Sequence, residues 1–169
     1  LKMKLRSLRE RELVAAIRRD FEQSGPGVQL GIGDDAAIIR PGRAELLLTT
    51  DLLIEDVHFT TAIQPAFLLG RKSLNVNVSD IAAMGGRPRF ALLGLGLKAG
   101  LKRDWVEAFF AGFREAAAEA KVILVGGDVS ASNKTCISVT LAGEAERSVR
   151  RSGARPGDSL FVSGPLGLA

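Results

Sequence analysis

The order of helix-like and strand-like segments constrains the fold of this chain most strongly. A first helix is predicted to end by residues 24–27, Pro65 opens a second that Gly85 and Gly86 close, and a third covers about 103–120. Strand-like runs lie near 36–40, 45–50, 89–97, 122–125 and 135–143. Because helices and strands do not alternate strictly, this order predicts an α+β fold with helices packed on one face of a mixed or antiparallel sheet.

The last twenty residues differ in character from the rest. Residues 152–158 form a cluster of turn-forming residues, and a further strand is predicted over Ser159–Ser163. We therefore place a domain boundary near residue 150. Residues 1–150 are predicted to form an N-terminal domain and 151–169 the start of a second, so the chain is expected to be a fragment.

Composition excludes several classes of protein. Of the 169 residues, 46% are hydrophobic and 25% charged, which is typical of a globular domain. No apolar run approaches the roughly 20 residues of a membrane span, and no signal peptide precedes the first helix. One cysteine cannot form an intramolecular disulfide, and one histidine excludes a His-rich zinc site. We expect a soluble, cytoplasmic protein that does not bind membranes.

The net charge of +4 could indicate nucleic-acid binding, so its distribution matters. Seven of the 23 basic residues lie in the first 19 positions, but they alternate with Glu10, Glu12 and Asp20 on a helical pattern. Such a pattern is typical of a solvated helix face. The chain also has no tyrosine and few aromatic residues for stacking on bases. The charge suits phosphorylated small molecules equally well, and we expect no nucleic-acid partner.

Acidic residues recur beside glycines and after hydrophobic runs. GIGDD contains Asp34 and Asp35, LLLTTD ends in Asp51, VILVGGD ends in Asp128, and Asp80 lies in the second predicted helix. A strand that ends in an aspartate would place a carboxylate at the rim of the sheet, where several could bind Mg²⁺. Neighbouring glycines would let backbone N–H groups approach phosphate oxygens, and these are Gly31, Gly33, Gly126 and Gly127.

Each of these features also has a structural explanation. An aspartate next to a glycine is common in turns, so a single motif does not define a site. His58, in DVHF, is by itself better explained as a partly buried histidine that has no role in binding. The sequence contains no GxxxxGK[ST] motif, which excludes a P-loop, and no protein-kinase motif set.

Five motifs occur together in order and carry a family resemblance. They are LGIGDDAAI, TTD followed by VHF, NVNVSDIAAMGG, LVGGD and RSGARPGD. In this combination, residues 28–169 resemble the N-terminal half of the thiamine-monophosphate kinase family, which belongs to the aminoimidazole-ribonucleotide-synthetase-like superfamily. The resemblance implies an α+β N-terminal domain whose sheet is completed by dimerisation.

The resemblance also implies roles for individual residues. It implies magnesium ligands at Asp35, Thr49, Thr50, Asp51, Asp80 and Asp128. ATP contacts are implied at Gly127, Asp128 and Arg151, and a contact with thiamine monophosphate at His58. No catalytic acid or base is implied, because the accepting phosphate is already an anion at neutral pH.

The implied reaction transfers the γ-phosphoryl group of ATP to thiamine monophosphate, with several Mg²⁺ ions as cofactors and a homodimer as the functional unit. The family chain is about twice as long as this one, so the 169 residues alone are expected to be inactive. Two alternatives stay open at this point. One is another ATP-using enzyme of the same superfamily, and the other is a non-catalytic nucleotide- or metal-binding dimerisation module.

Overall fold

The computed structural model describes residues 10–21, 25–30, 38–39, 44–150, 154–162 and 164. Within them the chain forms three helices and six strands, in the order α1 (Glu10–Asp20), β1 (Val28–Leu30), β2 (Ile38–Ile39), β3 (Glu45–Ile54), α2 (Ala66–Ala83), β4 (Arg87–Lys98), α3 (Arg103–Ala120), β5 (Ile123–Ser132) and β6 (Cys136–Ala145). The predicted second and third helices are confirmed. None of the helices in these ranges is long and apolar enough to cross a membrane.

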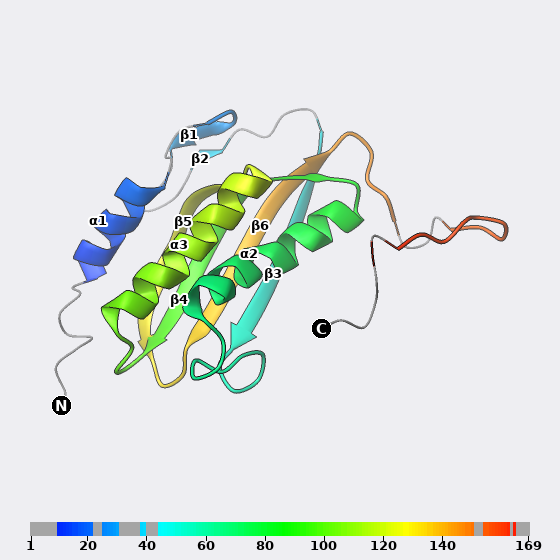
Figure 1. Cartoon of the computed structure of the whole chain (residues 1–169). Coiled ribbons are helices and arrows are strands. Elements are labelled where there is room, and N and C mark those ends of the chain that lie inside the picture. The colour runs from blue at the N-terminus through cyan, green and yellow to red at the C-terminus, as the bar shows by residue number, and fades with distance from the viewer. Residues whose placement is uncertain are drawn as a thin grey trace.

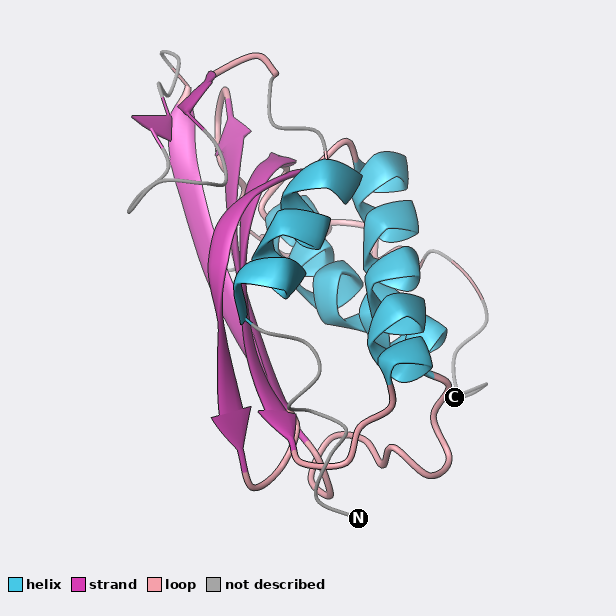
Figure 2. Ribbon diagram, turned by 90° about the vertical axis from the view of Figure 1, so that its left-hand side faces the viewer, coloured by secondary structure: helices cyan, strands magenta, loops and turns pink. Residues whose placement is uncertain are grey.

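Four strands form one mixed sheet in the order β3-β6-β4-β5 (Figure 1). β6 pairs antiparallel with β3 and β4, whereas β5 pairs parallel to β4, because α3 supplies the crossover that a parallel pair requires. β1 and β2 form a separate antiparallel pair. Figure 2 shows the helices together on one face of the sheet. The predicted α+β fold with a mixed sheet and helices on one face is therefore confirmed.

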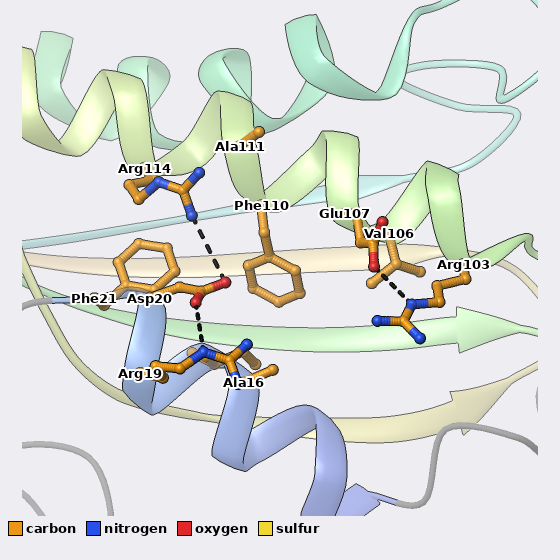
Figure 3. Close-up of a pocket in the computed structure, with 11 residues that line it drawn as sticks. Ala16, Arg19, Asp20, Phe21, Arg103, Val106, Glu107, Phe110, Ala111 and Arg114 are labelled. Atoms are coloured by element: carbon orange, nitrogen blue, oxygen red, sulfur yellow. Dashed lines mark hydrogen bonds and ion pairs between the residues drawn. The ribbon is translucent and has the colours of Figure 1, made fainter.

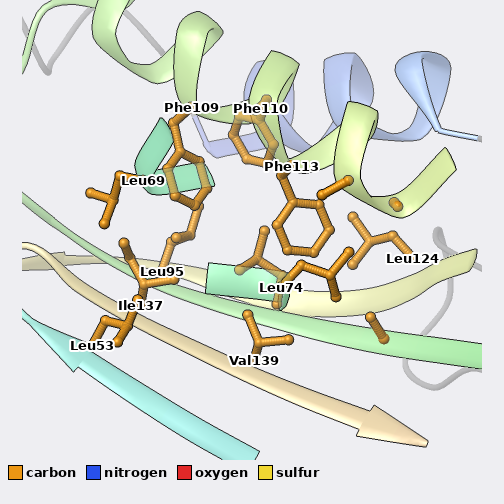
Figure 4. Close-up of a cluster of buried hydrophobic side chains, with 14 of the residues drawn as sticks. Leu53, Leu69, Leu74, Leu95, Phe109, Phe110, Phe113, Leu124, Ile137 and Val139 are labelled. Atoms are coloured by element: carbon orange, nitrogen blue, oxygen red, sulfur yellow. The ribbon is translucent and has the colours of Figure 1, made fainter. Parts of the chain in front are cut away.

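The core lies between this sheet and helices α2 and α3. Phe109 and Phe113 of α3 point from the helix layer toward the sheet, where they meet buried side chains of α2 and of the strands, among them Leu69, Leu74 and Ile137 (Figure 4). All five side chains are at most 1% exposed. Burying side chains of this size stabilises the fold by about 1.5–3 kcal/mol each, so this layer fixes where α2 lies over β3.

Two glycines allow α2 and α3 to pack closely. A Cβ atom on Gly70 of α2 would lie 2.0 Å from the backbone oxygen of Phe109, and one on Gly112 of α3 would lie 1.9 Å from that of Phe67. No side chain fits between backbones at that separation. The two helices therefore contact each other through backbone at these positions, which brings the charged residues of α2 into a fixed place above the sheet.

The opposite face of the sheet, called the open face here, is uncovered by any described helix and is apolar. Alternate residues of β3 project from it, and Leu46, Leu48 and Leu52 are 56%, 68% and 52% exposed. Leu92 of β4 adds to the same face at 44% exposure. A row of exposed leucines on one sheet face is typical of a surface that another molecule covers.

Three strands are longer than predicted. β3 and β5 each extend to ten residues, so Asp51 and Asp128 lie inside strands and not at the rim of the sheet as predicted. Pairing with β6 and β4 continues past the polar residues, and this pairing outweighs their local turn preference. β4 is also longer than the predicted run 89–97 and continues without interruption through Gly94 and Gly96.

The strand predicted over Ser159–Ser163 is absent from its described residues, 159–162. Leu160 and Phe161 are 98% and 89% exposed there. A hydrophobic segment forms a strand only where a neighbouring strand satisfies its backbone, and no described strand pairs with this one.

Candidate functional site

Three predicted metal-binding residues lie on the helix-facing side of the molecule. Along β3, Leu53 is buried in the core and Leu47 packs against it. Thr49 and Asp51 follow Leu47 at intervals of two residues, so their side chains face the same side of the sheet as the two leucines. The Thr49 hydroxyl donates a hydrogen bond to Oδ2 of Asp80 on α2, at 2.7 Å. We call Thr49, Asp51 and Asp80 the oxygen cluster.

The other predicted metal ligands that the structure describes, Asp128 and Thr50, lie on the open face. Asp128 of β5 is paired with Gly94, Gly94 with Ser138, and Ser138 with Leu52 of β3. Residues paired in this way share a face, so Asp128 lies on the same face as the exposed Leu52. Three strand spacings separate Asp128 from β3, or roughly 14 Å. Its carboxylate accepts a hydrogen bond from the Ser130 hydroxyl at 2.9 Å.

Thr50 also lies on the open face, one residue from Thr49. Its hydroxyl donates to the backbone oxygen of Val139 and accepts from the Thr140 hydroxyl, both at 3.1 Å. Across the described residues, no group of three or more His, Cys, Asp or Glu side chains lies close enough to hold a metal ion. The structure thus brings Thr49 and Asp80 together and separates them from Thr50 and Asp128. Asp35 and Arg151 lie outside the described residues.

Gly127, predicted at ATP, occupies a position that only glycine fits. It has a φ of +155°, and a Cβ atom there would lie 1.9 Å from the backbone oxygen of Leu93 on β4. The paired strands shift register nearby, between Ala91 and Leu92. Packing against β4 is therefore sufficient to explain this glycine, and its contact with ATP stays a prediction.

His58 lies in a tight turn after β3. Asp56 adopts a left-handed conformation with φ +66°, and its N–H donates to the backbone oxygen of Phe59 at 2.8 Å. The backbone N–H of Ile54 donates to Nδ1 of His58 at 3.1 Å. Because Nδ1 accepts this bond, the ring proton of the neutral imidazole lies on Nε2, and the exposed ring offers one N–H donor to a ligand.

A buried carboxylate that the sequence analysis missed anchors the same turn. Glu55 is 4% exposed and accepts hydrogen bonds from Lys98, from the Thr61 hydroxyl at 2.7 Å and from the Thr135 N–H at 3.0 Å. Burial acts to raise the pKa of Glu55, but these three hydrogen bonds outweigh it and lower the pKa to about 2, against an ordinary 4.5. The one available signal was a pair of acids within the hydrophobic run LLIEDVHF.

Lys72 of α2 is a second residue that the sequence analysis missed. Its ammonium group donates to the backbone oxygen of His58 at 3.3 Å, so it lies beside the turn. Its neighbour Arg71 instead forms ion pairs with Glu115 and Glu119 of α3. The signal in the sequence was a basic pair within an otherwise uncharged part of the helix.

A separate cavity of about 370 Å³ lies between α1 and α3 (Figure 3). Its floor includes Phe110, and its rim is charged. Asp20 lies 3.2 Å from Arg19 and 3.8 Å from Arg114. Arg103 pairs with Glu107 one helical turn away. None of the predicted site residues lines this cavity, and its arginines already have carboxylate partners, so it is not the predicted phosphate site.

Comparison with known proteins agrees with this fold and these motifs. The N-terminal domain of AIR synthase related protein matches residues 33–145, and the chain belongs to this family. It is 45% identical over 165 residues to the thiamine-monophosphate kinase of Aquifex aeolicus, which covers 98% of this chain and 52% of that protein. The Bacillus subtilis enzyme of the same name is 39% identical over 83% of this chain and 44% of its own length.

Solved structures share the architecture. AaThiL complexed with AMPPCP and TMP matches with a TM-score of 0.64 and 38% identity, over 90% of this chain and 47% of that one. The chain therefore spans about half the length of the relatives it matches.

Proposed function

We propose that this chain is the N-terminal part of a thiamine-monophosphate kinase, which transfers the γ-phosphoryl group of ATP to thiamine monophosphate. The observation that carries the proposal is the 45% identity to such a kinase across 98% of the chain. The turn that holds His58 adds an N–H donor for a phosphate, and the oxygen cluster adds ligands for Mg²⁺. In the reaction, an oxygen of the accepting phosphate bonds to the γ-phosphorus, the bond to the bridging oxygen breaks, and ADP leaves.

The residues present fit magnesium. Thr49 and Asp80 are held 2.7 Å apart by a hydrogen bond in which the threonine is the donor, so the lone pairs of its oxygen are available to a cation. Asp51 adds a second carboxylate from the same side of β3. This all-oxygen set suits Mg²⁺ better than softer metals. Bound Mg²⁺ would neutralise charge on the phosphates and align them.

The other predicted ligands belong to the proposal as well. Asp128 is proposed as a further magnesium ligand together with Asp35 and Thr50. ATP is proposed to contact Gly127, Asp128 and Arg151. No general base is needed, because the attacking phosphate oxygen already carries charge. His58 is proposed to donate its Nε2–H to the phosphate of thiamine monophosphate, which orients the accepting oxygen.

A homodimer forms part of the proposal. The open face exposes four leucines across β3 and β4, and Asp128 lies on this face away from the oxygen cluster. A second copy of the chain would cover the leucines and change the surroundings of Asp128. We also propose that residues 151–169 begin a second domain, without which the chain has no steady kinase activity.

Thiamine diphosphate formation tests the proposed function. The full-length polypeptide that contains this chain is incubated with ATP, Mg²⁺ and thiamine monophosphate, and the product is separated and quantified. We expect one thiamine diphosphate for each ADP, and no product when thiamine monophosphate is replaced by thiamine. ADP formation that does not depend on thiamine monophosphate would contradict the proposal.

A further inference from the structure

Among the described residues, the charged groups around the turn that holds His58 all have a partner of opposite charge except Lys72. Of the two acids in the turn, Glu55 is bonded to Lys98, and Asp56 lies 3.4 Å from the ammonium group of Lys134. Arg71 is neutralised by two glutamates of α3. Among the residues that the structure describes, no carboxylate lies within 4.0 Å of Lys72. A positive charge without a carboxylate partner is thus held beside an exposed histidine.

The contact between Lys72 and the turn leaves donors available. The ammonium group has three N–H donors, and only one is needed for the backbone oxygen of His58 at 3.3 Å. The His58 ring has its Nδ1 occupied by the N–H of Ile54, so Nε2–H is its remaining polar group. The two groups of donors, one on the turn after β3 and one on α2, therefore lie in the surroundings of a single residue, His58.

We propose that Lys72 and His58 together form an anion subsite for a phosphate monoester, with Lys72 as a binding residue that supplies the charge. The lysine is a point charge and tolerates different phosphate orientations, whereas the Nε2–H of His58 is directional. Neither the predicted sites nor the relatives' names assign Lys72 a role. That the phosphate is the one of thiamine monophosphate rests on the proposed function.

The position of the subsite fits two phosphate-bearing substrates. α2 runs antiparallel to β3, because Asp80 contacts Thr49 near the middle of β3 and Lys72 contacts the turn that follows its end. Lys72 and Asp80 are eight residues apart on one helix, or about 12 Å along its axis. One phosphate can therefore be held at the Lys72 end while ATP is anchored at the oxygen cluster, with its γ-phosphate extending toward the first phosphate, because in-line transfer requires the two to meet.

Nuclear magnetic resonance of His58 tests the subsite directly. His58 is the only histidine in the sequence, so its ring signals are unambiguous. The chain is titrated with inorganic phosphate at constant pH and ionic strength, without metal. We expect a saturable shift of the His58 ring signals in the unmodified chain. The absence of a saturable shift would overturn the proposal.

Substitutions at Lys72 separate this subsite from non-specific attraction. Lys72→Gln and Lys72→Met should each raise the phosphate dissociation constant about tenfold, and Lys72→Arg should change it by less than about threefold. Lys121→Gln, an exposed lysine that follows α3, is the charge-matched control and should have no effect. Backbone amide spectra confirm that each variant is folded. Equal dissociation constants for the Lys72→Gln and Lys121→Gln variants would overturn the proposal.

Kinetics of the full-length protein distinguish this inference from the proposed function. Lys72→Gln should raise KM for thiamine monophosphate about tenfold and leave KM for ATP within about twofold. Thiamine diphosphate formation with an unchanged KM in this variant would overturn the subsite and leave the proposed function in place. A Lys72-dependent phosphate response in a protein that forms no thiamine diphosphate would support the subsite and contradict the proposed function.

Discussion

The hydroxyl of Thr49 on β3 donates a hydrogen bond to Oδ2 of Asp80 on α2, and the two atoms are 2.7 Å apart. The residues are 31 positions apart in the sequence, so the contact depends on how α2 packs over the sheet. Asp80 is exposed, which means that its second oxygen is open to solvent or to a cation. The bond fixes the orientation of a carboxylate before any ligand binds.

Substitution of Asp80 should therefore uncouple metal from nucleotide. In the full-length protein, we expect Mg²⁺ to strengthen binding of a non-hydrolysable ATP analogue by about 5- to 150-fold, because the cation offsets repulsion between carboxylate and phosphate. Asp80→Asn should remove most of this effect. Calorimetry with and without Mg²⁺ measures it, and Asp104→Asn, an exposed acid in the first turn of α3, is the control. An unchanged Mg²⁺ effect in Asp80→Asn would remove Asp80 from the metal site.

The Glu55 network predicts a pH dependence of stability. The pKa of Glu55 is about 2 in the folded chain and near 4.5 when unfolded, so its stabilising effect is complete above about pH 4.5 and is lost as pH falls toward 2. The lost contribution amounts to at most roughly 3 kcal/mol. Urea unfolding between pH 2.5 and 7 should show a smaller pH dependence for Glu55→Gln than for the unmodified chain. Glu107→Gln, which is exposed, should retain the full dependence.

The close contact of Gly112 with α2 predicts that replacing this glycine by alanine destabilises the protein, which is the reverse of the usual effect in a helix. Replacing glycine by alanine inside a helix normally stabilises by about 0.5–1 kcal/mol. Gly112→Ala should instead destabilise by about 2 kcal/mol or more, because its Cβ would overlap the backbone of Phe67 and push the helices apart. Ala118→Gly, on the exposed side of α3, tests the ordinary propensity and should cost about 1 kcal/mol. Chemical denaturation measures the free energy of unfolding of both variants, and a stabilised Gly112→Ala variant would contradict the prediction.

The open face predicts self-association. We expect a homodimer at micromolar concentration, and Leu48→Asp should convert it to monomer, because a carboxylate would be placed in the centre of the apolar row. Ile63→Asp provides the control, since Ile63 is 84% exposed but lies outside the sheet. Sedimentation equilibrium measures the mass. A 17.9 kDa monomer for the unmodified chain at these concentrations would contradict the dimer.

The sequence was sufficient to predict the helices, but it was not sufficient to predict the length of the strands. Helix bounds follow from local signals such as Pro65 before α2 and the apolar face of α3. Strand ends depend on partners, and the polar residues around Asp51 and Asp128 resemble turns until β6 and β4 are known to pair with them. The faces of the two aspartates could not be assigned for the same reason.

The residues of the candidate site also fall into two groups, those that a local motif predicts and those that depend on long-range contacts. His58 was found because it stands within a recognisable motif, but its fixed ring orientation depends on the backbone N–H of Ile54, which no motif encodes. Lys72 and Glu55 were missed because their partners lie 14 and 43 residues away along the chain. Long-range contacts of this kind follow only from the packing of the turn against α2 and β4.

The hydrogen bond that fixes the His58 ring predicts which amide side chain, glutamine or asparagine, can better replace the histidine. If Nε2–H donates to the phosphate of thiamine monophosphate, His58→Ala in the full-length protein should lower kcat/KM for that substrate about 10- to 150-fold, with KM for ATP nearly unchanged. The amide nitrogen of glutamine lies near the place of Nε2, and that of asparagine near Nδ1. His58→Gln should therefore retain more activity than His58→Asn. Equal activity of these two variants, or equal losses for both substrates, would make His58 a structural residue of the turn.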